Sequence, residues 1–364
     1  MIIQDVINHL ETFAPLNYAE DFDNVGLLVG DKNETLTGIL VTLDTLETVV
    51  DEAIENNCNL IVSFHPIVFK GLKKITGKTY VERVVLKAIK HNIAIYAIHT
   101  ALDNHIQGVN AMICKQLNLV NTSILIPQNN TIKKLTTYVP RSEASKLREA
   151  LFAAGAGQIG NYSDCSFNIE GTGTFNPNQN ANPSIGKIGE IHTEAETLIA
   201  VTFPKHLEGK ILKALFTTHS YEEVAYEVTT LENKNQHIGI GMLGELVDEL
   251  SEIEFLAYLK TKMNTACVRH SALLGKPIKK IAVLGGSGSF AIPNAKHAGV
   301  DAFITADLKY HDFFTAENEL ILADIGHFES EQFTKNGLVA HLTKKITNFA
   351  IVLSKTDTNP VKYF

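Results

Sequence analysis

The amino-acid sequence predicts an α/β protein, in which a mostly parallel-sheet domain is interrupted by a smaller α+β domain of ferredoxin-like element order. Strand-like and helix-like segments alternate in the first third of the chain and again in the last third. Between them the order of elements changes, and a polar stretch rich in glycine, asparagine and proline appears. We place the boundaries near residues 128 and 234. The α/β domain then comprises residues 1–128 and 234–364, and the inserted domain residues 129–233.

The first third supplies the start of the parallel sheet. Residues 36–44, 58–65 and 93–99 are rich in β-branched and apolar residues and are predicted strands. The segments between them, residues 45–57 and 79–92, have the apolar spacing of helices. A β-α-β-α-β order of this kind predicts parallel strands covered by helices.

The remaining predicted elements lie in the inserted domain and in the last third of the chain. In the insertion, the polar stretch at residues 170–190 suits a long hairpin or a mobile loop. If it contributes one or two strands, the order becomes β-α-β-β-α-β. The other predicted elements are strands at 133–140, 196–204, 224–232, 279–286, 300–307 and 320–327, with helices at 141–157 and 205–219.

Composition limits the class of protein. The chain has 364 residues, of which 45% are hydrophobic and 20% charged, as is usual for globular proteins. The net charge of −8 argues against a non-sequence-specific nucleic-acid binder, because such a protein needs a basic face. We expect no membrane association, since no segment has the ~18 apolar residues of a membrane span. The four cysteines are scattered, and residues 1–15 resemble an amphipathic helix rather than a signal peptide, so we expect a cytoplasmic protein.

Three predicted strands end in histidines that are accompanied by carboxylates. The first ends at His65, the second at His99 with Asp103 four residues on, and the third at His327 with Glu331 four residues on. Residues four apart share a helix face, so His327 and Glu331 could bind one ion. Ligands of parallel sheets bind beyond the carboxyl ends of the strands, which predicts a metal site at one shared rim. The alternative is that each histidine is an ordinary polar residue where a strand meets a loop.

The donor set indicates which metals would suit this rim. Mixed imidazole and carboxylate ligands favour zinc, with manganese, iron or nickel as alternatives. A site without thiolates usually keeps positions open for water or substrate. Since a carboxylate can bridge two ions, one or two divalent ions per subunit are expected.

A second motif lies at residues 280–307. Gly286, Gly288 and Ala291 satisfy G-x-G-x-x-A after a strand, and Asp307 ends the next strand where a ribose-binding acid belongs. The simplest interpretation is a glycine-rich turn between a strand and a helix. A phosphate site at Gly286, Ser287, Gly288 and Ser289 is the second interpretation, and a dinucleotide site is the third.

Five ordered motifs together resemble one known family over essentially the whole chain. They are EDFDNVGLLVG, SFHPIVFKGLKKI, YAIHTALDN, IAVLGGSGSF and DIGHFESEQF. They are similar to the GTP cyclohydrolase I type 2 homologues, also called NGG-one-interacting-factor-three-like proteins. The resemblance implies a two-metal centre at His65, Asp103, His327 and Glu331. It also implies a toroidal homohexamer, a PII/CutA-like insertion, and opening of the GTP purine ring by a metal-bound hydroxide.

The sequence departs from this family at one position. The usual bacterial motif is His-His-Pro, with the first histidine also a ligand, but here that position is Phe64. Phenylalanine cannot coordinate, so one ion should be held less tightly or be completed by His99, water or substrate.

The leading hypothesis is therefore a metal-dependent hydrolase acting on a small molecule such as a nucleotide. His99 or Glu329 would serve as general acid or base. The alternatives are a non-catalytic scaffold or metal-trafficking protein, which the loss of a ligand at Phe64 favours, and a dinucleotide-binding protein.

Overall fold

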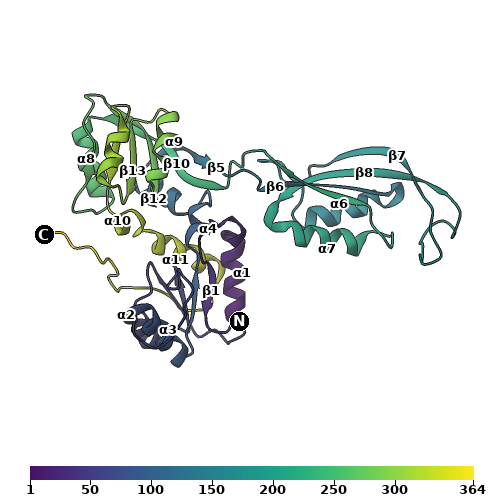
Figure 1. The fold of residues 1–364 in the computed structure, drawn as a ribbon, viewed down its shortest axis with the longest axis horizontal. Coiled ribbons are helices and arrows are strands. Elements are labelled where there is room, and N and C mark those ends of the chain that lie inside the picture. The colour runs from purple at the N-terminus through teal and green to yellow at the C-terminus, as the bar shows by residue number, and fades with distance from the viewer. The chain divides into compact units, whose positions relative to one another are not determined.

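The computed structural model describes residues 1–364 and divides the chain into two compact units (Figure 1). The first unit comprises Met1–Pro127 and Gln236–Phe364, and the second comprises Gln128–Asn235. No helix is both long and apolar enough to pass through a bilayer.

The first sheet of the larger unit has five strands. Its order is β1 (Gly26–Val29), β4 (Ala94–Ala97), β3 (Leu60–Ser63), β2 (Ile39–Thr42) and β15 (Ile351–Leu353). Strands β4, β3, β2 and β15 are parallel, whereas β1 is antiparallel to β4. β2, β3 and β4 are buried along their whole length, as expected of parallel strands covered on both faces.

Helices cover both faces of this sheet because alternate residues of a strand point to opposite sides. Leu40, Ile61 and Ile95 share a buried cluster with residues of α2 (Glu47–Glu55) and α3 (Tyr80–Lys90). Val41, Val62 and Tyr96 belong to a second cluster, with α1 (Ile3–Phe13) and α11 (Thr334–Lys345).

The second sheet of the larger unit has six strands. Its order is β11 (Arg269–His270), β14 (Ile321–Asp324), β13 (Ala302–Ala306), β12 (Ile278–Ser287), β10 (Gly239–Leu250) and β5 (Val120–Pro127). β12, β13 and β14 are parallel, and the other pairs are antiparallel. On one face Ala282 and Phe303 pack near α9 (Ile292–His297).

One buried cluster joins the two sheets. It contains Val41 and Val62 of the first sheet together with Val283 and Ile304 of the second. The helices α4 (His99–Asp103), α5 (Val109–Gln116), α8 (Glu252–Lys262) and α11 also contribute to it. This shared core fixes the ends of strands from both sheets relative to one another.

The smaller unit is one antiparallel sheet with two helices. Its elements are β6 (Ile132–Pro140), α6 (Ala144–Ala153), β7 (Phe167–Phe175), β8 (His192–Pro204), α7 (Glu208–Thr218) and β9 (Tyr226–Leu231). The strand order is β7-β8-β6-β9, and every neighbouring pair is antiparallel. Leu135, Val201 and Phe203 pack against Leu147 of α6 and Ile211 of α7, so both helices contribute to one core.

The predicted α/β class is confirmed, but one expectation about its sheets is wrong. The histidine-bearing strands do not share the rim of a single sheet: β3 and β4 lie in the first sheet, and β14 lies in the second. The last third forms its own sheet because β12 pairs with the long strand β10, which also pairs with β5. Residues 170–190 form part of a hairpin, since β7 continues to Phe175 and β8 begins at His192.

Candidate metal centre

The two sheets bring His65, His327 and Glu331 together. β3 ends at Ser63, and His65 follows two residues later. Gly326, with a φ of 91°, is the residue before α10 (His327–Glu331). Because His327 and Glu331 are four residues apart in this helix, they lie on one face of it. His65 Nε2 lies 3.1 Å, and His327 Nε2 3.3 Å, from the same oxygen, Glu331 Oε2. Ligand atoms of the three residues lie within 4.8 Å of one another.

A carboxylate orients each of these histidines from behind. His65 Nδ1 donates to Asp44 Oδ1 at 2.8 Å, and His327 Nδ1 donates to Asp307 Oδ2 at 2.6 Å. These bonds fix the tautomers so that both Nε2 atoms face Glu331. Histidine ligands of metals typically donate their other ring nitrogen to a carboxylate in this way.

Asp103 is a buried carboxylate near the centre whose Oδ1 has no hydrogen-bond partner. It lies outside the cluster of His65, His327 and Glu331, but it is close enough to feel the charges of all three. Asp103 ends α4, which follows β4 directly. Burial raises the pKa of the Asp103 carboxyl well above its usual range, and the negative charge of Glu331 adds to this effect. An unpartnered buried carboxylate oxygen is costly, and a cation beside it would reduce that cost.

The two imidazoles and the Glu331 carboxylate shift one another's pKa values. Burial lowers the pKa of His65, but hydrogen bonds and charge from Asp44 and Glu331 outweigh burial and raise it to about 9. Burial also lowers the pKa of His327, but hydrogen bonds and charge from Asp307 and Glu331 outweigh it and raise this pKa to about 11. Burial raises the pKa of Glu331, yet the two histidines lower it to about 2. A metal ion must displace the protons of both imidazoles, so its affinity rises with pH.

Gly286 forms a wall of the centre. It has a φ of 68°, and a Cβ atom at this position would lie 2.5 Å from Glu331 Oε1 and 3.3 Å from His327 Cε1. Its N–H donates to Ser330 Oγ at 2.9 Å. The glycine-rich segment therefore packs directly against the metal-ligand candidates.

The rest of the predicted phosphate loop lies beside this wall. The Ser287 hydroxyl donates to Asp307, the carboxylate that orients His327. Gly288 packs against Thr305, and Ser289 begins the 3₁₀ turn Ser289–Ala291. The Gly286 N–H and the Ser287 hydroxyl are therefore both engaged within the protein.

His99 is built like the two histidines of the centre. Its Nδ1 donates to Asp23 Oδ1 at 2.8 Å, and its ring centroid lies 5.2 Å from that of His65. Phe64 is fully buried, with its ring centroid 4.9 Å from His65 and 5.5 Å from His99. Where the resemblance implies another ligand, the chain thus has an apolar ring packed against both imidazoles.

Glu329 lies away from these residues. It is two positions from His327 and therefore points from a different side of α10. Its Oε1 accepts from Asn359 Nδ2 at 3.0 Å, and its Oε2 lies against Gly326.

The sequence did not reveal Asp23 and Asp44 as orienting residues, and it suggested another role for Asp307. Asp44 and Asp307 follow the carboxyl ends of β2 and β13. Their place after strand ends is the same signal that marks the histidines, so the sequence pattern does contain it. Asp23 gave no such signal, because it precedes β1 and reaches His99 only through the tertiary fold.

Comparison with known proteins gives matches over the whole chain. The sequence model of Duf34/NIF3 (NGG1p interacting factor 3) matches residues 1–360. A "GTP cyclohydrolase 1 type 2 homolog" from Bacillus subtilis (strain 168) is 38% identical, covering 99% of this chain and 98% of the relative. One from Halalkalibacterium halodurans is 36% identical, with 99% and 98% covered. The crystal structure of a Bacillus cereus protein related to NIF3 has a TM-score of 0.89 and 36% identity, covering 100% of this chain and 99% of that one.

Proposed function

The chain belongs to the Duf34/NIF3 (NGG1p interacting factor 3) family, and from this premise we propose that it is a metal-dependent hydrolase acting on a nucleotide or a related heterocycle. One observation carries the proposal. Two histidines, each held by a carboxylate, direct their Nε2 atoms to one buried oxygen of Glu331, at 3.1 and 3.3 Å.

The residues at the centre fit a divalent ion. His65, His327 and Glu331 would hold it, with Asp103 as a fourth ligand through its unpartnered Oδ1. Two imidazoles with two carboxylates favour zinc, and manganese, iron or nickel are the alternatives. When bound, such an ion supplies Lewis-acid chemistry and lowers the pKa of a coordinated water towards about 7. One ion per chain would be held tightly, because Phe64 contributes no ligand to a second.

His99 is the residue we propose for proton transfer. Its Nδ1 is occupied by Asp23, which leaves Nε2 to accept or release a proton beside His65. Glu329 is a less suitable group, since its carboxylate is engaged by Asn359. The fully buried ring of Phe64 keeps water from one side of both imidazoles.

The test combines metal analysis with turnover. Purified protein is loaded with zinc, manganese, iron or nickel, and GTP consumption is measured for each. We expect bound metal and turnover in the wild type, loss of both in His65→Ala and Glu331→Gln, and no change in the exposed control Asp248→Asn. Bound metal without GTP turnover under any loading would exclude the cyclohydrolase reaction.

The second candidate function is a non-catalytic metal-binding scaffold or a metal-trafficking protein. The observation that favours it is Phe64, because two-metal hydrolysis demands many ligands and this position supplies none. Metal loss in Glu331→Gln with unchanged hydrolysis would assign the hydrolysis to a contaminant and favour the scaffold. We also propose that the chain forms a homohexamer, which analytical ultracentrifugation tests through the mass of the assembly.

A further inference from the structure

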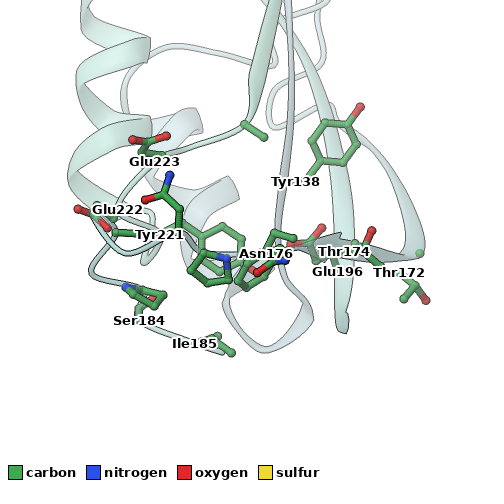
Figure 2. A pocket seen from close by; sticks show the side chains of 18 of the residues that line it. Tyr138, Thr172, Thr174, Asn176, Ser184, Ile185, Glu196, Tyr221, Glu222 and Glu223 are labelled. Atoms are coloured by element: carbon green, nitrogen blue, oxygen red, sulfur yellow. Dashed lines mark hydrogen bonds between the residues drawn. The ribbon is translucent and has the colours of Figure 1, made fainter. Parts of the chain in front are cut away.

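The smaller unit contains a cavity of about 740 Å³ that has no part in the metal centre (Figure 2). Its walls come from β7 and β8, from the 176–191 segment that joins them, and from residues 221–225 before β9. The backbone N–H of Asn182 donates to Glu222 Oε2 at 2.7 Å, which links the two loop segments that line the cavity. A volume of this size suits a small organic ligand.

The most buried polar group lining the cavity is the Glu196 carboxylate. Glu196 is only 9% exposed, and its Oε1 accepts from the Tyr221 hydroxyl at 2.8 Å. Burial and the charge of Glu196 raise the pKa of the Tyr221 phenol, which keeps it a donor. No lysine, arginine or histidine forms an ion pair with Glu196. A buried carboxylate without a cation is costly, so this group favours a positively charged ligand.

The neighbouring strand leaves room for this carboxylate. A Cβ atom on Gly173 of β7 would overlap Glu196 Oε2 and Cδ, so only glycine lets the side chain lie across the strand. The position of the carboxylate is therefore set by the β7–β8 pairing rather than by a flexible loop.

The charge of the lining excludes anionic ligands. Three glutamates, Glu196, Glu222 and Glu223, line the cavity, and its lining includes no lysine, arginine or histidine. A phosphate or carboxylate would meet repulsion without any compensating cation. The same field attracts a protonated amine.

Aromatic rings supply the apolar part of the lining. Phe175 and Tyr221 lie with ring centroids 5.8 Å apart at 60°, and Tyr138 lines the same cavity. Aromatic faces attract organic cations through their quadrupoles, and they also bury the carbon skeleton of a ligand.

We propose that this cavity binds a small organic cation, a protonated amine of metabolite size, with its ammonium group on Glu196 and its carbon skeleton against Phe175 and Tyr221. The inference goes beyond the proposed hydrolase function, because it uses no residue of the metal centre.

Isothermal titration calorimetry on the full chain tests the proposal. The probes are tyramine, phenethylamine and spermidine, with phenylacetate as an anion and phenethyl alcohol as a neutral counterpart of similar shape. We expect at least one amine to bind with a Kd below about 1 mM, and both counterparts to bind at least about tenfold more weakly.

Two variants locate the binding. Glu196→Gln retains the size of the side chain and the acceptor for Tyr221, and we expect it to weaken amine binding at least about tenfold. Glu227→Gln is the matched control: Glu227 is exposed on β9 outside the cavity lining, and binding should not change. Circular dichroism spectra verify that both variants are folded.

Three results would overturn the inference. They are the absence of binding by every amine, equal binding of phenylacetate, and unchanged amine affinity in folded Glu196→Gln. His65→Ala changes the metal centre and should retain full amine binding. Amine binding can therefore be tested whether or not the hydrolase proposal holds.

Discussion

Replacing Gly286 by alanine should weaken metal binding through a direct clash with a ligand. The added Cβ would lie 2.5 Å from Glu331 Oε1, far inside normal contact distance. Glu331 is buried and already contacts both imidazoles, so it cannot move aside without leaving the position that they share. Gly286 also has a φ of 68°, which alanine adopts only with strain.

Gly286→Ala should act in two ways, through backbone strain and through the clash with Glu331, and a control variant separates them. Alanine at positive φ costs about 1–2 kcal/mol of folding stability. Gly299→Ala carries the same strain, since Gly299 has a φ of 64°, but nothing lies within 4 Å of its added Cβ. Both variants should therefore lose similar stability from strain. Only Gly286→Ala should lose metal affinity, by at least the roughly 10–100-fold that follows from disturbing groups that orient ligands.

Competition with a chromogenic chelator measures zinc affinity, and urea unfolding of the metal-free protein measures stability. The reasoning is refuted if folded Gly286→Ala binds zinc as tightly as the wild type. It is also refuted if Gly299→Ala loses as much zinc affinity as Gly286→Ala, because strain alone would then account for the effect.

Three further predictions address the centre and its surroundings. Asp307→Asn removes the charge that orients His327, so zinc affinity should fall roughly 10–100-fold, with Asp248→Asn unchanged; equal affinity of both variants in the chelator assay would contradict this role. Phe64→His should raise the metal content, measured by elemental mass spectrometry, from one towards two ions per chain, and an unchanged content would show that the position cannot serve a second ion. Burial and two neighbouring histidines lower the pKa of His105 from 6.5 to about 4. At a pH between about 4 and 6.5 the unfolded chain therefore binds a proton at His105 that the folded chain does not. Thermal stability should therefore fall as the pH drops from about 6.5 towards 4, and less steeply in His105→Asn; parallel curves would exclude His105 as the cause.

Local sequence patterns were sufficient for the elements that are buried on both faces. Residues 36–44 and 58–65 contain the short apolar runs Ile39–Val41 and Leu60–Val62, which lie in β2 and β3. The amphipathic spacing at residues 79–92 predicted α3, which spans Tyr80–Lys90. Strand β7 was harder to identify, because most of its residues are exposed and two glycines interrupt its pattern.

The sequence by itself determined which side chains end the strands: His65 after β3, and His327 with Glu331 after β14. Strand periodicity and the i, i+4 spacing of a helix are local properties, so no long-range contact was needed to find them. Only the tertiary structure decided that these ends come from two sheets and meet at one oxygen, because sheet membership depends on pairing between distant strands. The close approach of Gly286 to Glu331 and the burial of Glu196 in the cavity of the smaller unit arise in the same way, from packing between segments that no local pattern connects.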